Sequence, residues 1–318
     1  MTHPSIAIIA GGTSKEAAVS RSSAAEVTGA LKLNYANVNL LELDHRLPQV
    51  LLALEPDVVF PVLHGPPGED GTIQGFLEIL GLPYVGSDVH ASAAAMDKNV
   101  AKALFRQASL PVCPDLLISA DSDLAAAQDR IHAELGERVV LKPLNQGSAI
   151  GVIPVMNGGE LGKTLSGAVE QYGTVLIEPF VMGREMTVGV LATHECEPIV
   201  APVIEIRTPA GSWYDYEHRY GANLSEHVIP ARIHPDSEER MREIALLAHQ
   251  VLGCRDLSRA DFILCENAAG EEQLVLLEVN SLPGMTPTSL YPDGMAALGI
   301  DFADLMSRLV ESALRRSA

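Results

Sequence analysis

The chain has few aromatic residues, few cysteines and few basic residues for its length. Aromatic side chains make up 4% of the 318 residues. The four cysteines have neither metal-site nor disulfide-framework spacing and are expected to be reduced thiols: Cys113, Cys196, Cys254 and Cys265. The 22 Lys and Arg residues face 41 Asp and Glu residues, and the net charge of −19 argues against nucleic acid or an anionic membrane as a partner.

Long apolar segments are also missing. The chain contains no uninterrupted run of about 18 apolar residues, so no transmembrane helix is expected. The N-terminus lacks the basic stretch and the long apolar core of a signal peptide, and we expect a cytoplasmic protein. An apolar content of 47% over 318 residues is instead typical of a globular protein with two or three domains.

The N-terminal region alternates apolar strands with helices. This order predicts an open, mostly parallel sheet, in which ligands gather at the carboxyl ends of the strands. Turns that contain glycine, Gly11-Gly12 and His64-Gly65, follow the two strands. The predicted strands are 5–10 and 58–63, and the predicted helices are 16–31 and 72–80.

The rest of the chain predicts two α+β units that pack around a shared cleft. A single helix over 91–108 leads into the first unit, and the strands become longer after Gly183. The predicted strands are 114–118, 138–142, 152–155, 174–180, 185–192, 198–206, 261–265 and 274–279, and the predicted helices are 123–135, 160–171 and 236–252. The polar, aromatic loop 213–227 is expected to close over a site and exclude water.

The last two predicted strands carry the most informative residues. Residues two apart in a strand point to the same face, so Arg259 lies beside Asp261, and Glu278 lies beside Asn280. Turn residues between the strands predict a hairpin that brings the two pairs together. Two carboxylates and a carboxamide suit Mg²⁺, and the arginine adds positive charge where anionic charge develops. The alternative is a solvated hairpin with ordinary surface acids.

Two lysines and two glutamates could line a nucleotide site. Lys142 precedes a loop of small residues, which could approach an anion closely, and Lys98 lies on a helix. Glu178 and Glu185 flank the junction between the two α+β units. The loop does not follow G-x-x-x-x-G-K-[ST], which excludes a P-loop. The alternatives are that Lys142 is an ordinary loop lysine, that Lys98 lies on a solvated helix face, and that Glu178 and Glu185 are surface carboxylates at strand ends.

Glu16 and His64 each leave two interpretations open. Glu16 begins a helix after the Gly-Gly turn, where it could complement the helix dipole or bind a substrate ammonium group. His64 follows a strand and could be a loop histidine or a site residue. Spacing alone does not separate the two readings for either residue.

Together these motifs resemble the D-alanine–D-alanine ligases of the ATP-grasp superfamily, in the same order and over essentially the whole chain. The motifs in the N-terminal half are residues 11–16, 19–20, 63–65, 68–75, 84–87 and 96–98. Those in the C-terminal half are residues 142–143, 147–148, 214–216, 220, 259–261, 278–280, 283–286 and 289–290.

The resemblance implies a three-domain ATP-grasp architecture of class α/β and α+β. Residues 1–97 would form an N-terminal domain with an open parallel sheet, and residues 98–181 and 182–318 would form two α+β domains that sandwich ATP. The implied enzyme joins two D-alanines through an acylphosphate intermediate, for peptidoglycan precursor synthesis. ATP is the implied co-substrate, two Mg²⁺ (or Mn²⁺) ions are the implied cofactors, and a homodimer is the implied assembly.

The resemblance also implies roles for individual residues. Glu16 would bind the ammonium group of the first D-alanine and join Ser148 and Tyr220 through hydrogen bonds. The residues implied for ATP are Lys98, Lys142, Glu178, Phe180, Val181, Glu185 and Arg219. The residues implied for the metal ions are Asp261, Glu278 and Asn280. The remaining residues are Arg259 and the Gly284 N–H for the oxyanion hole, Ser289 and Leu290 for the second D-alanine, and His64 near the first.

The chain departs from the usual family pattern at several positions. Family members usually have Lys at the position of Arg219, Arg at Asn145, Ser at Ala149, a charged pair at Ala17-Ala18 and Thr at Ser281. These changes could alter ATP affinity or the choice of acceptor. The retained Tyr220 favours an amine acceptor. Two alternatives stay open: a related ligase with another amino-acid or hydroxy-acid acceptor, and a nucleotide-binding regulator without catalysis.

Overall fold

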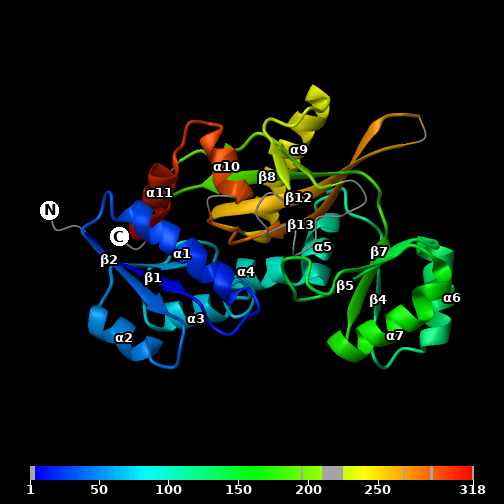
Figure 1. The fold of residues 1–318 in the computed structure, drawn as a ribbon, viewed down its shortest axis with the longest axis horizontal. Helices are drawn as coiled ribbons and strands as arrows, with labels where there is room; N and C mark the ends of the chain where they lie inside the picture. The colour runs from blue at the N-terminus through cyan, green and yellow to red at the C-terminus, as the bar shows by residue number, and fades with distance from the viewer. Residues whose placement is uncertain (1–3, 195, 210–224, 268, 287–288, 317–318) are drawn as a thin grey trace.

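The computed structural model describes residues 4–194, 196–209, 225–267, 269–286 and 289–316. Within these residues the strands form three sheets, which follow one another along the long axis of the molecule (Figure 1). None of the described helices is both long enough and apolar enough to cross a membrane. The four cysteines are free thiols; Cys113 and Cys254 are buried, whereas Cys196 is exposed.

The N-terminal sheet is parallel, as the sequence predicts. Its order is β2 (Asn37–Glu42), β1 (Ser5–Ala10) and β3 (Val58–Pro61), and β1 pairs in parallel with both neighbours. Its helices are α1 (Ala17–Leu31), α2 (Leu47–Leu54) and α3 (Thr72–Ile79). Neither β2 nor α2 was predicted from the sequence. The turns after β1 and β3 lie at the carboxyl edge of this sheet, where ligands of such sheets bind.

The single helix predicted over 91–108 is wrong. The chain forms two helices there, α4 (Val89–Met96) and α5 (Lys98–Gln107). Asp97 between them is extended, with φ −84° and ψ 104°, and its carboxylate accepts hydrogen bonds from the N–H groups of Asn99 and Val100. A capping aspartate satisfies free N–H groups of a new helix, so Asp97 ends one helix and begins the other. The break places Lys98 at the start of α5.

The second sheet is antiparallel and has helices on one side. Its order is β4 (Leu116–Ile118), β7 (Val175–Pro179), β5 (Val139–Pro143) and β6 (Ile153–Val155). The helices α6 (Leu124–Leu135) and α7 (Leu161–Tyr172) pack on it through a core that includes Ile131, Leu165 and Ile177. This unit forms the right-hand end of the molecule in Figure 1. It agrees with the predicted α+β unit.

The third and largest sheet carries the predicted hairpin. Its order is β11 (Glu226–Val228), β10 (Ile204–Arg207), β8 (Arg184–Ala192), β12 (Asp256–Glu266) and β13 (Glu272–Asn280), and β9 (Ile199–Val200) also pairs with β8. The single strand predicted over 198–206 is wrong, because β9 and β10 are separate strands. The predicted hairpin is confirmed, with both strands longer than expected.

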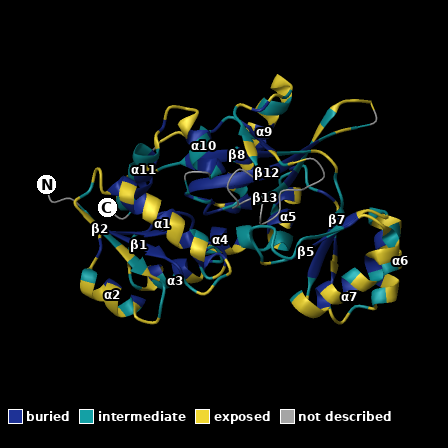
Figure 2. Ribbon diagram, viewed as in Figure 1, coloured by how far each residue is buried: buried dark blue, intermediate teal, exposed yellow. Residues whose placement is uncertain are grey.

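Alternation along the strands gives this sheet two different faces. Met186, Val188 and Phe262 point into a core shared with α4, α5 and the long helix α9 (Pro235–Leu252). The intervening residues, which include Thr187 and Asp261, therefore point to the opposite face. Figure 2 shows most of β8 and β12 in dark blue, so these strands are buried on both faces. Thr187 and Asp261 are therefore held by a buried part of the sheet.

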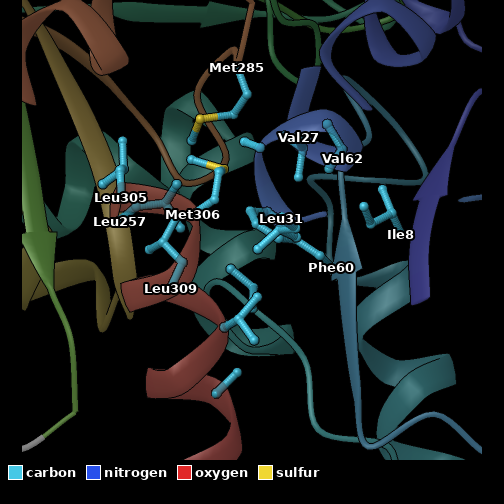
Figure 3. Close-up of a cluster of buried hydrophobic side chains, with 14 of the residues drawn as sticks. Ile8, Val27, Leu31, Phe60, Val62, Leu257, Met285, Leu305, Met306 and Leu309 are labelled. Carbon is cyan, nitrogen blue, oxygen red and sulfur yellow. The ribbon is translucent and has the colours of Figure 1, made fainter. Parts of the chain in front are cut away.

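The last two helices connect the largest sheet to the N-terminal sheet. They are α10 (Leu290–Ala296) and α11 (Phe302–Arg315). Leu305, Met306 and Leu309 of α11 belong to the same apolar core as Leu31 and Phe60 of the N-terminal region (Figure 3). Burial of large apolar side chains contributes about 1.5–3 kcal/mol each. This shared core holds the loops after β1 and β3 in place relative to the hairpin.

Candidate active site

A cavity of about 620 Å³ lies between the four-stranded sheet and the largest sheet. Pockets for small ligands usually measure about 300–1,000 Å³. The predicted ATP residues within the described part of the chain all line this cavity: Lys98, Lys142, Glu178, Phe180, Val181 and Glu185. Arg219 lies outside the described residues. Glu278, predicted as a metal ligand, also lines the cavity and connects it to the hairpin.

Charged groups on one wall of the cavity are paired with one another. The Nζ of Lys142 lies 2.5 Å from Glu178 Oε2, and a second lysine, Lys102, donates to Glu178 Oε1. Burial raises the pKa of Glu178, but Lys142 and Lys102 outweigh burial and lower the pKa overall. Burial lowers the pKa of Lys142, but Glu178 outweighs it, so this pKa is raised. Glu178 is therefore an ionised carboxylate at neutral pH.

Lys98 connects the cavity to the hairpin of β12 and β13, the reaction hairpin. Its Nζ donates to the Gln146 carbonyl oxygen at 2.8 Å and lies 3.5 Å from Glu278 Oε2. The break at Asp97 makes this contact possible, because it sets Lys98 at the first turn of α5. The positively charged Lys98 side chain therefore lies where the cavity meets the hairpin carboxylates.

The reaction hairpin has the geometry that the sequence predicts. Arg259 pairs across the strands with Asn280, and Asp261 pairs with Glu278. Arg259 donates two hydrogen bonds to Asp261, from Nε to Oδ1 at 2.8 Å and from Nη2 to Oδ2 at 2.7 Å. Asn280 Nδ2 donates to Asp261 Oδ2 at 3.1 Å, and Thr187 Oγ1 donates to Asp261 Oδ1 at 2.6 Å. Asp261 is thus held by three neighbours.

The donor set on the reaction hairpin fits a hard divalent cation. Among the described residues no group of three or more His, Cys, Asp and Glu side chains could hold a metal ion by itself. The predicted set has only two carboxylates, Asp261 and Glu278, and its third member is the amide oxygen of Asn280. All three are oxygen donors on neighbouring strands, as Mg²⁺ prefers, and Mg²⁺ commonly completes its shell with phosphate and water.

A second group of predicted residues meets around the carboxylate of Glu16. Ser148 Oγ donates to Glu16 Oε1, which is the contact implied by the resemblance. Two glycines make room for the carboxylate: a Cβ at Gly65 would lie 2.8 Å from Glu16 Oε2, and one at Gly147 would lie 3.6 Å away. Tyr220, implied as the third member, lies outside the described residues. Glu16 therefore joins the N-terminal sheet to the loop after β5.

The loop after β3 adds two buried titratable groups. Burial and then Arg259 lower the pKa of His64 to about 4, so this histidine is neutral at pH 7. Burial and then the charge of Glu16 raise the pKa of Glu69 to about 8, although Glu69 Oε2 accepts a hydrogen bond from Gly65 N–H at 2.7 Å. Glu69 mainly holds a proton at neutral pH, which reduces repulsion with Glu16.

The residues predicted for the second substrate are close to one another. A Cβ at Gly284 would lie 2.9 Å from Ser289 Oγ. Ser289 Oγ also accepts a hydrogen bond from Thr286 N–H at 2.9 Å, and Leu290 begins α10. Substitution of Gly284 would therefore displace the hydroxyl of Ser289.

Sequence reasoning missed three residues of the site. Thr187 bonds to Asp261, Lys102 bonds to Glu178, and Glu69 lies beside Glu16. Thr187 could have been found from its spacing, because it is two residues from Glu185 on a strand. Lys102 follows Lys98 by four residues, so both lysines lie on one face of α5. Glu69 falls in a quoted motif, but its protonation depends on burial, which the sequence does not show.

Some positions that depart from the family pattern lie within the described residues, and these lie at the edge of the site. Ala149 lines the cavity with φ 56°, and Asn145 is exposed in the same loop. Ser281 is buried after β13. Ala17 and Ala18 begin α1, directly after Glu16. None of them replaces a residue of the reaction hairpin.

Two family models match the chain. One, described as "D-ala D-ala ligase C-terminus", matches residues 104–311, and the other, "D-ala D-ala ligase N-terminus", matches residues 47–87. The chain is 41% identical over 314 residues to the D-alanine–D-alanine ligase of Granulibacter bethesdensis, covering 98% of each chain. It is also 41% identical to the same ligase of Moorella thermoacetica, covering 97% of this chain and 99% of the relative.

Solved structures of similar proteins have the same fold. The D-alanine–D-alanine ligase from Bacillus anthracis, complexed with ATP, has a TM-score of 0.82 and 29% identity, with 99% of this chain and 98% of that one covered. The VanG D-Ala:D-Ser ligase from Enterococcus faecalis has a TM-score of 0.81 and 30% identity, with 98% of this chain and 100% of that one covered.

Proposed function

The chain belongs to the D-alanine–D-alanine ligase family, and we propose that it joins two D-alanine molecules into D-alanyl-D-alanine while converting ATP to ADP and phosphate. One observation supports this most. A cavity of about 620 Å³ that could hold ATP ends at Glu278, which also pairs with Asp261 on the reaction hairpin. Two of the loops at the N-terminal sheet also meet other parts of the site: Ser148 bonds to Glu16 after β1, and Arg259 acts by its charge on His64 after β3. Nucleotide and substrate groups can therefore meet at one end of the cavity.

ATP makes the carboxylate of the first D-alanine reactive. A carboxylate oxygen attacks the γ-phosphorus, the bond to the ADP oxygen breaks, and an acylphosphate forms. In phosphoryl transfer the protein mostly positions the groups and neutralises charge. Lys142 and Lys98 supply positive charge in the cavity wall, and Glu178, Glu185 and the backbone at Phe180 and Val181 would hold the adenosine.

Metal ions are expected at the reaction hairpin. Asp261, Glu278 and Asn280 would hold two Mg²⁺ or Mn²⁺ ions, because they form an oxygen donor set of which Glu278 lines the cavity. When bound, such ions neutralise charge on the transferred phosphoryl group.

The second D-alanine then attacks the acylphosphate. Its amine, after losing a proton, adds to the carbonyl carbon, and the tetrahedral oxyanion collapses with release of phosphate. Arg259 and the Gly284 N–H would stabilise that oxyanion. Arg259 suits this role because Asp261 holds its guanidinium through two hydrogen bonds. A donor fixed in advance does not have to reorganise during the reaction.

The substrates would be held by groups on the N-terminal loops and on α10. Glu16, fixed by Ser148, would bind the ammonium group of the first D-alanine, and the neutral His64 would lie beside that substrate. Ser289 and Leu290 would receive the carboxylate of the second D-alanine. Tyr220 and Arg219 would complete the site from the lid. Closure would protect the acylphosphate from hydrolysis.

We further propose the setting of this reaction. Three domains, 1–97, 98–181 and 182–318, agree with the three sheets and with the helix break at Asp97. The protein would act in the cytoplasm as a homodimer and supply the dipeptide for peptidoglycan precursors. The net charge of −19 is unfavourable for binding to nucleic acid or to an anionic membrane surface.

A ligase with a different acceptor is the second candidate. It is favoured by the similarity to a D-Ala:D-Ser ligase, whose TM-score of 0.81 is close to the 0.82 of the D-alanine–D-alanine ligase. The fold alone therefore does not decide the acceptor. The retained Tyr220 and the Ser289-Leu290 pair favour D-alanine.

The test is phosphate release from ATP and Mg²⁺ by the purified protein, with D-alanine alone or paired with D-serine or D-lactate. Mass spectrometry identifies the product. We expect release that requires D-alanine and yields D-alanyl-D-alanine as the main product in every mixture. A mixed dipeptide or an ester as the main product would establish the second candidate instead. The absence of turnover despite ATP binding would show a regulator.

A further inference from the structure

A line of alternating charges runs from the surface to the wall of the cavity. Arg106 contacts Asp115, Asp115 Oδ1 lies 3.0 Å from Lys102 Nζ, Lys102 contacts Glu178, and Glu178 contacts Lys142. The Arg106 side chain is 42% exposed, whereas the Lys102 side chain is 3% exposed. The three cations and two carboxylates have a net charge of +1. This positive excess lies beside a site for an anionic nucleotide.

Lys102 and Lys142 hold opposite oxygens of the same carboxylate. Lys102 binds Glu178 Oε1, and Lys142 binds Oε2. Lys142 lines the cavity, but Lys102 is not among the residues that do so within the described part of the chain. Asp115 is a second anionic neighbour of Lys102. Lys142 can therefore reach a bound phosphate, whereas Lys102 is confined to the wall.

A phosphate group in the cavity would compete with Glu178 for Lys142. If Lys142 moved to the phosphate and no other cation remained, Glu178 would become a buried unpaired charge, which is strongly unfavourable. Lys102 prevents Glu178 from becoming unpaired, because it stays bound to the other carboxylate oxygen. Lys142 can then exchange one anionic partner for another.

We infer that Lys102 is a positioning residue of the nucleotide site: it keeps Glu178 paired and in place while Lys142 turns to the nucleotide phosphates. The inference rests on the proposed function, since it requires that ATP binds in this cavity. Lys102 itself touches neither ATP nor the amino acids. Its loss should therefore weaken ATP binding and leave the later chemistry largely intact.

The test is Lys102→Met, which removes the charge and keeps an unbranched side chain. We expect the KM for ATP, and the Kd for ATP measured by calorimetry, to rise about tenfold, as expected for loss of a hydrogen bond to a charged group. The kcat and the KM for D-alanine should change by less than about twofold. Lys163→Met, at an exposed position on α7, is the matched control and should change none of these values.

A second pair of variants separates positioning from packing. In a Glu178→Gln background there is no carboxylate for Lys102 to hold, so adding Lys102→Met should change the KM for ATP by less than about twofold. A tenfold increase in both backgrounds, or no change in the wild-type background, would overturn the inference. Thermal melting checks folding; if Lys102→Met does not fold, Lys102→Gln takes its place with the same expected shift.

The same assays distinguish failure of the proposed function from failure of the role inferred for Lys102. A wild-type protein without D-alanine-dependent phosphate release would refute the proposed function. An active wild-type protein whose KM for ATP is unaffected by Lys102→Met would refute only the role of Lys102.

Discussion

The two ends of the candidate site hold their charged side chains in different ways. At the reaction hairpin, Arg259, Asp261 and Asn280 bond to one another, and Thr187 on the next strand adds a further bond to Asp261. At the nucleotide end, Lys142 bonds to Glu178, which also has Lys102 as a partner. Strand register sets the first arrangement. Contacts between separate elements, α5, β5 and β7, set the second.

From this difference we infer that the reaction hairpin is fixed in advance and that the nucleotide end can exchange partners. Asp261 already orients the guanidinium of Arg259, so under the proposed function Arg259 meets the oxyanion without changing position. Under the proposed function, Lys142 turns from Glu178 to a nucleotide phosphate. Variants at the reaction hairpin should therefore affect kcat most, and variants at the nucleotide end should affect the KM for ATP.

The largest effect is expected for Arg259→Ala. Loss of one oxyanion donor costs about 3 kcal/mol, so kcat should fall by at least about a hundredfold, while the KM for ATP stays within a few-fold. Steady-state phosphate release measures both values. Arg308→Ala, which removes an exposed arginine paired with Asp304 on α11, is the control. Near-wild-type turnover of Arg259→Ala would exclude the oxyanion role.

Lys142→Met should give the opposite pattern. Loss of a charge-assisted bond to phosphate, about 2 kcal/mol, predicts that the KM for ATP rises about thirtyfold. The KM for D-alanine should change little. Titration of ATP at saturating D-alanine checks this. An unchanged KM for ATP combined with a lost kcat would contradict the view that the nucleotide end mainly affects ATP binding and the reaction hairpin mainly affects kcat.

Thr187→Val tests the support beneath the reaction hairpin. Valine keeps the shape of threonine but cannot donate to Asp261, and loss of a hydrogen bond of about 1 kcal/mol predicts a roughly fivefold lower kcat. The KM for ATP should stay the same. The measurement is kcat at saturating ATP and D-alanine. An unaltered kcat would show that Asp261 does not need the hydrogen bond from Thr187 on β8.

An effect on stability, with no effect on turnover, is expected in the scaffold behind the hairpin. Burial lowers the pKa of His249 to about 4, below its usual value of 6.5. Below pH 6.5 the unfolded chain binds a proton that the folded chain does not, so the contribution of His249 to stability is present above pH 6.5 and is lost as the pH falls towards 4.

His249→Asn isolates this contribution, because its side-chain oxygen can replace Nδ1 beside Ser258 Oγ, 2.8 Å away. Between pH 7 and pH 5 the free energy of unfolding of the wild type should fall by about 2 kcal/mol more than that of the variant. Urea denaturation at both pH values measures this difference. Equal slopes with pH would show that His249 does not titrate as its burial implies. Kinetic constants at pH 7 should not change.

The same comparison explains how much the sequence could predict. The reaction hairpin was predictable because alternation fixes which residues share a face: Arg259 and Asp261 are two residues apart on one strand, and Glu278 and Asn280 on the next. The parallel order of β1 and β3 followed from the alternation of strands and helices in the same way.

The nucleotide end was only partly predictable. Lys142 and Glu178 lie on separate strands and are 36 positions apart, so no local pattern shows that they pair. The break at Asp97 was missed because the alanine-rich residues around it favour one continuous helix, whereas the capping carboxylate ends it. Lys102 could have been placed on the face of Lys98, but its partner depends on how α5 packs against β7.

The most direct test of the account follows the oxygen atoms of the first substrate. D-alanine labelled with ¹⁸O in both carboxyl oxygens is converted with unlabelled ATP, and the released phosphate is analysed by mass spectrometry. If the carboxylate attacks the γ-phosphorus and the amine then displaces phosphate, each released phosphate carries one ¹⁸O atom. Unlabelled phosphate, formed together with the dipeptide, would contradict the acylphosphate route and the roles given to both ends of the site.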